Sequence, residues 1–209
     1  MDKQLEQILD KVHALYNKYG IKSVTMDDVA KELGMSKKTL YHYVKDKNDL
    51  VEKVIALEFS IRAKEMNKIR ELGLNAIEEL FEVNRLINMM LKRVNPSMEY
   101  DLMKYFPALH TKICTERKKR MFDSMMDNIL KGKKEGLYRK EINEEIISKL
   151  YVSRVEKVFH EDVQTISDFT SEDFISEVFI YHIRGIANKK GIAFLEANKN
   201  ELTRKVKSL

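Results

Sequence analysis

The sequence has one cysteine, two prolines, seven glycines and no tryptophan among its 209 residues. Its single cysteine, Cys114, cannot form a disulfide within the chain, and the sequence has no Cys/His cluster spaced like a structural zinc site. The shortage of glycine and proline argues against β-sandwiches and barrels, which need turn residues about every 8–12 positions. No GxSxG, P-loop or GxGxxG motif occurs, so the sequence indicates no enzyme, metal or cofactor.

Long apolar runs are missing as well, so the sequence predicts no transmembrane helix. The first residues, MDKQLEQILDK, are amphipathic and charged, unlike a signal peptide. We therefore expect a cytoplasmic protein. The net charge is +5, but residues 1–60 have ten basic and ten acidic side chains, so net charge alone does not indicate DNA binding.

Helical periodicity is what the sequence does have. Apolar residues between Leu5 and Tyr19 recur every three or four positions, which predicts a helix that ends at Gly20. N-capping residues predict three further helices, over residues 26–33, 37–44 and 46–70. Six more helices are expected near residues 75–93, 97–105, 108–134, 143–165, 171–188 and 192–207. The predicted fold class is therefore all-α.

Residues 25–44 have the pattern of a helix-turn-helix motif. This motif needs a small residue where its helices cross, a glycine in the turn and apolar residues at inward positions. Ala30 is the small residue, and Gly34 can adopt the positive φ of the turn without strain. The inward apolar residues are Val29, Leu33, Met35, Leu40 and Val44.

The side chains expected on the surface of this motif suit DNA. The amino end of a helix attracts phosphate, and lysine beside it adds positive charge. Tyrosine and histidine farther along the second helix offer hydrogen-bond donors and flat apolar faces to base edges. Lys47, in the first turn of the next helix, is the predicted phosphate clamp. The predicted DNA-binding residues are Thr25, Ser36, Lys37, Lys38, Thr39, Tyr41, His42, Tyr43 and Lys47.

The stretch TMDDVAKELGMSKKTLYHYVKDKNDLV resembles the DNA-binding domain of the tetracycline-repressor (TetR) family, over about residues 5–55. The pattern is carried by Thr25, Ala30, Gly34, Met35, Ser36, Thr39, Leu40, Tyr41, Tyr43, Lys47 and Leu50. Lys38 and Val44 depart from it, because a small residue and Phe are common at these places.

The resemblance implies a three-helix helix-turn-helix domain over residues 1–60, joined by a long helix to a C-terminal helical domain over residues 61–209. The C-terminal domain would dimerise and bind ligand. The implied function is a homodimeric, one-component transcriptional regulator, usually a repressor of a palindromic operator that a small ligand releases.

Methionine is concentrated between residues 66 and 126, which contain eight of the eleven methionines. Because methionine adapts to irregular shapes, this region suits a pocket for a hydrophobic effector, although an ordinary helical core would use methionine too. The predicted pocket residues are Met89, Met90, Tyr100, Phe106, Phe122 and Met126.

The helices predicted near residues 143–165 and 171–188 each have an apolar stripe wider than one subunit's core requires. Pairing both segments with their copies in a second subunit would form a four-helix bundle, whereas the alternative is burial within one monomer. The predicted interface residues are Leu150, Tyr151, Val155, Val158, Phe174, Val178, Phe179, His182, Ile183 and Ile186.

Three functions therefore stay open: a ligand-responsive DNA-binding regulator, a DNA-binding regulator without a small-molecule ligand, and a helical carrier of apolar molecules. The first two predict a salt-dependent, sequence-dependent affinity for DNA, and the carrier predicts none. The leading hypothesis is the ligand-responsive regulator. Its expected partners are a double-stranded operator, a second copy of the chain and a small-molecule effector, with no membrane and no cofactor.

Overall fold

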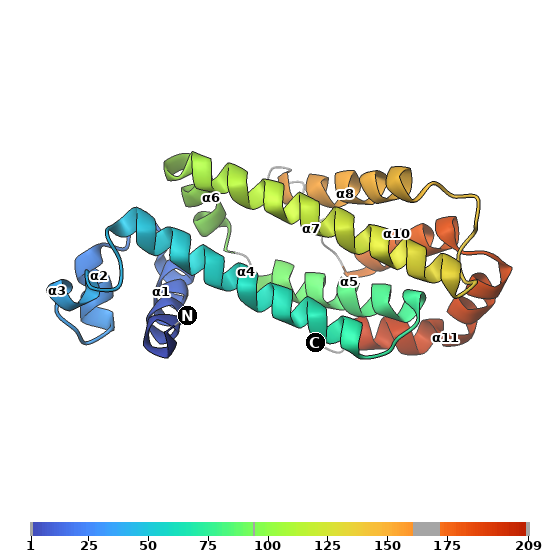
Figure 1. Ribbon diagram of the computed structural model, residues 1–209, viewed down its shortest axis with the longest axis horizontal. Helices are drawn as coiled ribbons and strands as arrows, with labels where there is room; N and C mark the ends of the chain where they lie inside the picture. Colours follow the sequence, from blue (N-terminus) through green and yellow to red (C-terminus); the bar gives the residue numbers. More distant parts are fainter. Residues whose placement is uncertain (1, 94, 161–171, 208–209) are drawn as a thin grey trace. The chain divides into compact units, whose positions relative to one another are not determined.

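The computed structural model describes residues 2–93, 95–160 and 172–207 (Figure 1). The regular elements of this part are helices, so the predicted all-α fold class is confirmed. No stretch of the described helices combines the length and low charge that crossing a bilayer requires. The helices are α1 (Lys3–Tyr19), α2 (Met26–Glu32), α3 (Lys37–Leu40), α4 (Lys47–Glu71), α5 (Ala76–Arg93), α6 (Pro96–Tyr105), α7 (Pro107–Lys134), α8 (Glu144–His160), α10 (Glu172–Ile186) and α11 (Lys189–Lys207).

Local sequence signals explain several helix ends. Thr25 and Asp28 form a reciprocal capping box at the start of α2. Asn95 caps α6, with Pro96 at its first position, where proline's missing N–H is not needed. Gly20 ends α1 with φ of 80° and ψ of 156°, a conformation that is nearly restricted to glycine.

The helix predicted over residues 37–44 is shorter than expected, because α3 ends at Leu40 and residues 41–43 form turns. Two side chains of α4 bind backbone groups in the segment that follows α3. Lys53 Nζ donates to the Tyr43 carbonyl at 3.1 Å, and the Asp49 carboxylate accepts from the Lys45 N–H at 2.8 Å. The Tyr43 and Val44 N–H groups both donate to the Leu40 carbonyl, so the chain continues in tighter turns after α3.

The chain divides into two compact units. The first contains residues 1–67 and 91–114, and the second contains residues 68–90 and 115–209. The first unit extends beyond the domain predicted over residues 1–60, because Met98 and Leu102 of α6 belong to its core. The functional division near residue 60 stays a prediction.

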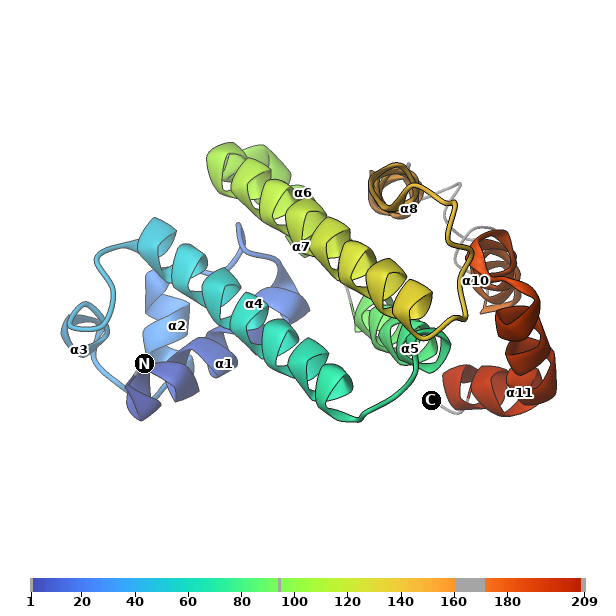
Figure 2. The same cartoon turned by 45° about the vertical axis from the view of Figure 1, so that its right-hand side comes forward.

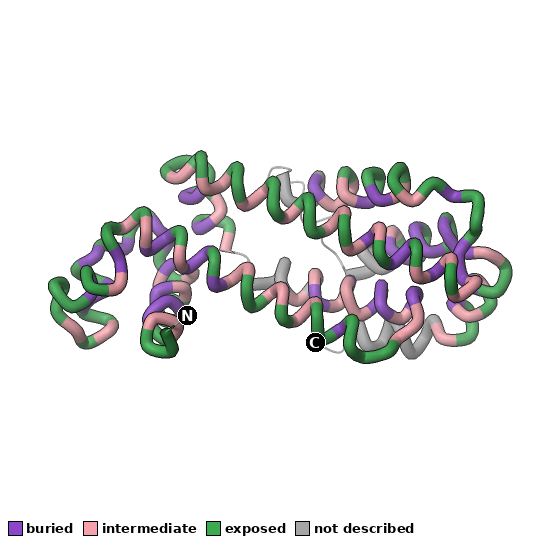
Figure 3. Tube along the Cα trace, in the orientation of Figure 1, coloured by how far each residue is buried: buried purple, intermediate pink, exposed green. Residues whose placement is uncertain are grey.

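In the first unit, α1, α2 and α4 surround the core, and α3 lies at the edge next to α2 (Figures 1 and 2). Figure 3 shows buried positions along α1, α2 and the first half of α4. Leu9, Val12, Leu40 and Leu50 have no exposed surface. Burial of these side chains fixes α3 on the other helices, although α3 is too short to be stable alone.

The second unit has its own core, formed by residues of α5, α7, α8, α10 and α11. The rings of Phe81 and Phe179 meet edge-on, with centroids 5.0 Å apart. Asn128, buried in α7, accepts from the Tyr138 hydroxyl at 3.0 Å and donates to the Ala76 carbonyl at 2.9 Å. These bonds tie α5 to α7 and to the loop after it, because buried polar groups need partners.

Candidate DNA-binding surface

The helix-turn-helix predicted from the sequence is present in the first unit. Gly34 has φ of 66°, and the Met35 N–H donates to the Ala30 carbonyl at 3.0 Å, which closes the turn between α2 and α3. Val29 is 1% exposed and Ala30 5%, so the inner side of α2 packs closely. The short side chain of Ala30 permits this packing.

The exposed face of α3 and the turns after it carry four of the predicted DNA-binding residues. Lys38, Thr39 and His42 are exposed, and Tyr41 is 43% exposed although it is aromatic. Tyr43 is half-buried and packs against the core, so less of it is available to DNA. This face combines a cation with hydrogen-bonding and flat apolar groups, as major-groove readout requires.

Thr25 and Ser36 act as helix caps in this structure. Ser36 Oγ accepts from the Thr39 N–H at 3.0 Å, and the two hydroxyl oxygens lie 2.8 Å apart. The Thr25 hydroxyl donates to Asp28 at 2.6 Å, and the hydrogen bonds from Thr25 lower the pKa of the Asp28 carboxyl. These residues therefore have a structural role besides the predicted one.

Lys37 is paired with an acidic residue of α2. Its Nζ lies 2.9 Å from the Asp27 carboxylate, and this contact raises the pKa of the Lys37 ammonium. Both side chains are exposed, so water screens the pair and a phosphate could replace Asp27 at little cost. The two residues are ten positions apart and on different helices, so no sequence pattern predicts this ion pair.

Lys47, the predicted phosphate clamp, contacts the loop between α1 and α2. Its Nζ donates to the Val24 carbonyl at 2.6 Å and to the Lys22 carbonyl at 3.3 Å. Burial lowers the pKa of Lys47, and the charge of Lys22 acts in the same direction. Backbone carbonyls leave no pattern in a sequence, so these partners of Lys47 could not be predicted. The phosphate contact stays a prediction.

The same part of the chain matches the model of a known family. Residues 8–54 match the family described as bacterial regulatory proteins, tetR family. An HTH-type transcriptional regulator of Staphylococcus aureus (strain USA300) is 33% identical over 66 residues. Residues 8–54 are therefore similar to the DNA-binding domain of TetR-family regulators. The match covers 32% of this chain and 36% of the staphylococcal protein, so this chain matches about a third of its relative's length.

Solved structures support the same fold over nearly the whole chain. A transcriptional regulator from Cytophaga hutchinsonii superimposes with a TM-score of 0.74 at 22% identity, covering 90% of this chain and 100% of that one. A gamma-butyrolactone receptor described as ArpA-like gives a TM-score of 0.63 at 13% identity, covering 99% and 97%. At these identities, the likeness concerns the fold alone.

The residues of the predicted effector pocket belong to both compact units. Tyr100 is 50% exposed and accepts a hydrogen bond from Lys104 at 2.9 Å, and Phe106 packs against the core of the first unit. Met89, Phe122 and Met126 are half-buried residues of the second unit, and the side chain of Met90 lies outside the described part. The pocket stays a prediction.

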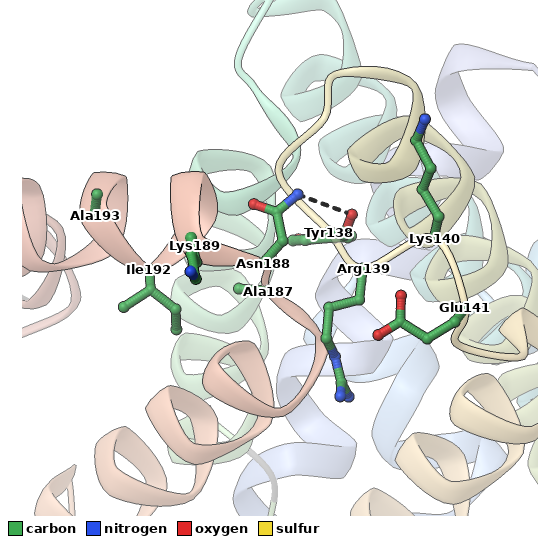
Figure 4. Close-up of a pocket in the computed structure, with 9 residues that line it drawn as sticks. All are labelled: Tyr138, Arg139, Lys140, Glu141, Ala187, Asn188, Lys189, Ile192 and Ala193. Atoms are coloured by element: carbon green, nitrogen blue, oxygen red, sulfur yellow. Dashed lines mark hydrogen bonds between the residues drawn. The ribbon is translucent and has the colours of Figure 1, made fainter.

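Two open grooves occur within the second unit. One is lined by Lys118, Lys119, Phe122, Lys149, Val152, Ser153 and Glu156, and thus includes one predicted pocket residue. The other lies where the loop after α7 meets the start of α11 (Figure 4). There Asn188 Nδ2 donates to the Tyr138 carbonyl at 3.2 Å, so these two polar groups bind each other.

Half of the predicted dimer residues are already buried within one chain. The buried ones are Tyr151, Phe179, His182, Ile183 and Ile186. Val155 and Val178 are half-buried, whereas Leu150 is 62% exposed. The side chains of Val158 and Phe174 lie outside the described part. Ile146, on the same helix as Leu150, is 63% exposed, and Tyr181, which is absent from the predicted set, is 79% exposed.

His182 is a buried imidazole on α10, close to Tyr151 of α8. Its ring lies 5.2 Å from the Tyr151 ring, and its Nε2 has no hydrogen-bond partner among the described residues. Burial lowers the pKa of His182 from 6.5 to about 4, and the nearby charge of Arg154 acts in the same direction. The folded protein therefore holds this imidazole neutral.

This burial predicts a pH dependence of stability. The unfolded chain protonates His182 near pH 6.5 and the folded chain only near pH 4, so the free energy of unfolding should fall as the pH is lowered between these values. The loss is at most about 3 kcal/mol. Urea unfolding at several pH values measures it. His182→Phe should remove this part of the pH dependence, and an unchanged profile in the variant would contradict the assignment.

Proposed function

We propose that this chain is a one-component transcriptional regulator that binds a palindromic operator as a homodimer. It acts as a repressor, and a small hydrophobic ligand releases it from the operator. The observation that carries the proposal is the exposed face of Lys38, Thr39, Tyr41 and His42, presented by a TetR-type motif. These residues would contact bases and phosphates in the major groove.

Dimerisation is supported by exposed apolar side chains on α8 and α10. Ile146, Leu150 and Tyr181 are each more than half exposed, an unfavourable arrangement that a second copy of the chain would relieve. A two-fold dimer would present two copies of α3 to half-sites one helical turn apart, about 34–36 Å.

The ligand is supported by the half-buried Met89, Phe122 and Met126 of the second unit, which offer adaptable apolar surface. A structural neighbour is named a gamma-butyrolactone receptor, so this fold can serve a small-molecule receptor. A regulator without a small-molecule ligand is the second candidate, because methionine also fills ordinary cores.

Selection of duplexes from a randomised pool by the purified protein tests DNA binding. Tyr41→Ala and His42→Ala should each weaken binding to the selected duplex by about 5–150-fold, the loss expected for one base contact, and should change the selected sequence. Tyr19→Ala is the matched control, because Tyr19 is a 54% exposed tyrosine on α1. Equal effects of Tyr41→Ala and Tyr19→Ala would contradict the proposed face.

A further inference from the structure

The loop between α1 and α2 is held by a carboxylate from α6. Asp101 is 9% exposed, and its Oδ2 accepts a hydrogen bond from the Lys22 N–H at 2.7 Å. Lys22 lies 79 residues earlier in the chain. A side chain remote in sequence thus fixes the backbone three residues before Thr25 begins α2.

Gly20 makes room for this carboxylate. A Cβ atom on residue 20 would lie 3.0 Å from Asp101 Oδ2, closer than most real contacts. The positive φ of Gly20 also disfavours any other residue there. The glycine that ends α1 therefore serves a second purpose, because it lets Asp101 reach the loop.

Other contacts fasten α6 to the same place. Asn95 Nδ2 donates to the Asn17 carbonyl near the end of α1. The Lys22 ammonium lies 4.6 Å from the centre of the Tyr105 ring, and this cation–π contact is favourable. Met98 of α6 is buried in the core of the first unit and packs α6 against it. The position of Asp101 is thus determined on several sides.

Lys47 holds the loop from the start of α4. It donates to the carbonyl of Lys22, the same residue whose N–H is bound by Asp101, and to the carbonyl of Val24. The opposite charges of Asp101 and Lys47 attract each other across the loop. Both backbone groups of Lys22 are therefore bound, the N–H by Asp101 and the carbonyl by Lys47. Asp101 thus helps to position a carbonyl that binds the Lys47 ammonium.

We infer that Asp101 is a positioning residue for DNA binding, which acts by fixing the loop that places Lys47 and the amino end of α2. The inference rests on the proposed function, since it assumes that Lys47 and α2 meet the DNA backbone. On this inference, a residue of α6, which lies outside the helix-turn-helix motif, affects the phosphate contacts that the motif makes.

A double-mutant cycle tests the inference, with the duplex selected by the wild-type protein as probe. Asp101→Ala should weaken binding about tenfold in the wild-type background, the loss typical of one charge-assisted hydrogen bond. In a Lys47→Ala background it should weaken binding clearly less than tenfold, because Lys47 is gone and only the amino end of α2 is still placed by Asp101. Asp101→Asn should recover most of the affinity, since its amide oxygen can still accept from Lys22.

Controls separate positioning from general damage. Met103→Ala removes a 53% exposed side chain of the same helix and should leave affinity unchanged. Amide hydrogen exchange at Lys22 should accelerate in Asp101→Ala and stay as in the wild type in Met103→Ala. If Asp101→Ala does not fold, Asp101→Ser takes its place in the cycle.

The outcomes distinguish this inference from the proposed function. A tenfold loss in both backgrounds, or no loss in either, would overturn the positioning role of Asp101. If the wild-type protein enriches no duplex at all, the proposed function fails instead.

Discussion

Replacing Ile183 with glutamate should unfold the second compact unit. Ile183 has no exposed surface and belongs to the same core as Phe81 and Phe179. A carboxylate there would be buried without a partner, and the apolar contacts of the isoleucine would be lost. The expected loss is at least about 4 kcal/mol, comparable to the whole stability of many domains.

Thermal unfolding followed by circular dichroism measures this effect. Leu150→Glu is the control, because Leu150 is also an aliphatic residue of the predicted dimer stripes but is 62% exposed. It should remain folded and should lower the melting temperature far less than Ile183→Glu does. A wild-type melting curve for Ile183→Glu would show that this core is wrongly assigned.

Combining Leu150→Glu with Tyr181→Glu should give folded monomers. Both residues are exposed on one chain, so the folded unit tolerates charge there, whereas a dimer interface over α8 and α10 does not. A monomer would lose the advantage of binding both half-sites at once. Its affinity for the selected duplex should fall by about 10²–10⁴-fold.

Sedimentation velocity and a binding titration measure the two effects. Leu130→Glu, a 48% exposed leucine on α7, is the matched control and should leave both unchanged. If the double variant remains a dimer with wild-type affinity, the interface lies elsewhere on the chain.

The sequence predicted those features that depend on neighbours along the chain. The end of α1 follows from Gly20, the start of α2 from Thr25 with Asp28, and the turn of the motif from Gly34. Each of these is a local rule in which the residue itself makes the conformation favourable. The TetR-type domain could be recognised because its pattern is built from such residues.

Features that depend on distant contacts could not be predicted. The contact of Lys53 with the Tyr43 carbonyl joins two different segments, and the Lys47 ammonium binds a carbonyl that carries no sequence signal. An apolar stripe in the sequence also does not show whether a helix face is buried in the core or in an interface, since both need apolar residues at helical spacing. Ile183 and Leu150 fit the same prediction, yet one is buried and the other exposed.

The predicted pocket shows a similar limit. Residues that are close along the chain need not belong to the same compact unit. Of the predicted pocket residues, Tyr100 and Phe106 belong to the first unit and Phe122 to the second. Spacing within one helix is reliable, but spacing across several helices requires their packing to be known.

The central claim is that the first unit reads DNA sequence, and a salt titration of two duplexes tests it most directly. Affinity of the wild-type protein is measured for the selected duplex and for a scrambled duplex of equal length and composition. We expect both affinities to fall steeply with salt, because lysines displace counterions from phosphate. We also expect the selected duplex to bind at least about 10³-fold more tightly throughout. Equal affinities for the two duplexes, or affinities that do not depend on salt, would contradict the account.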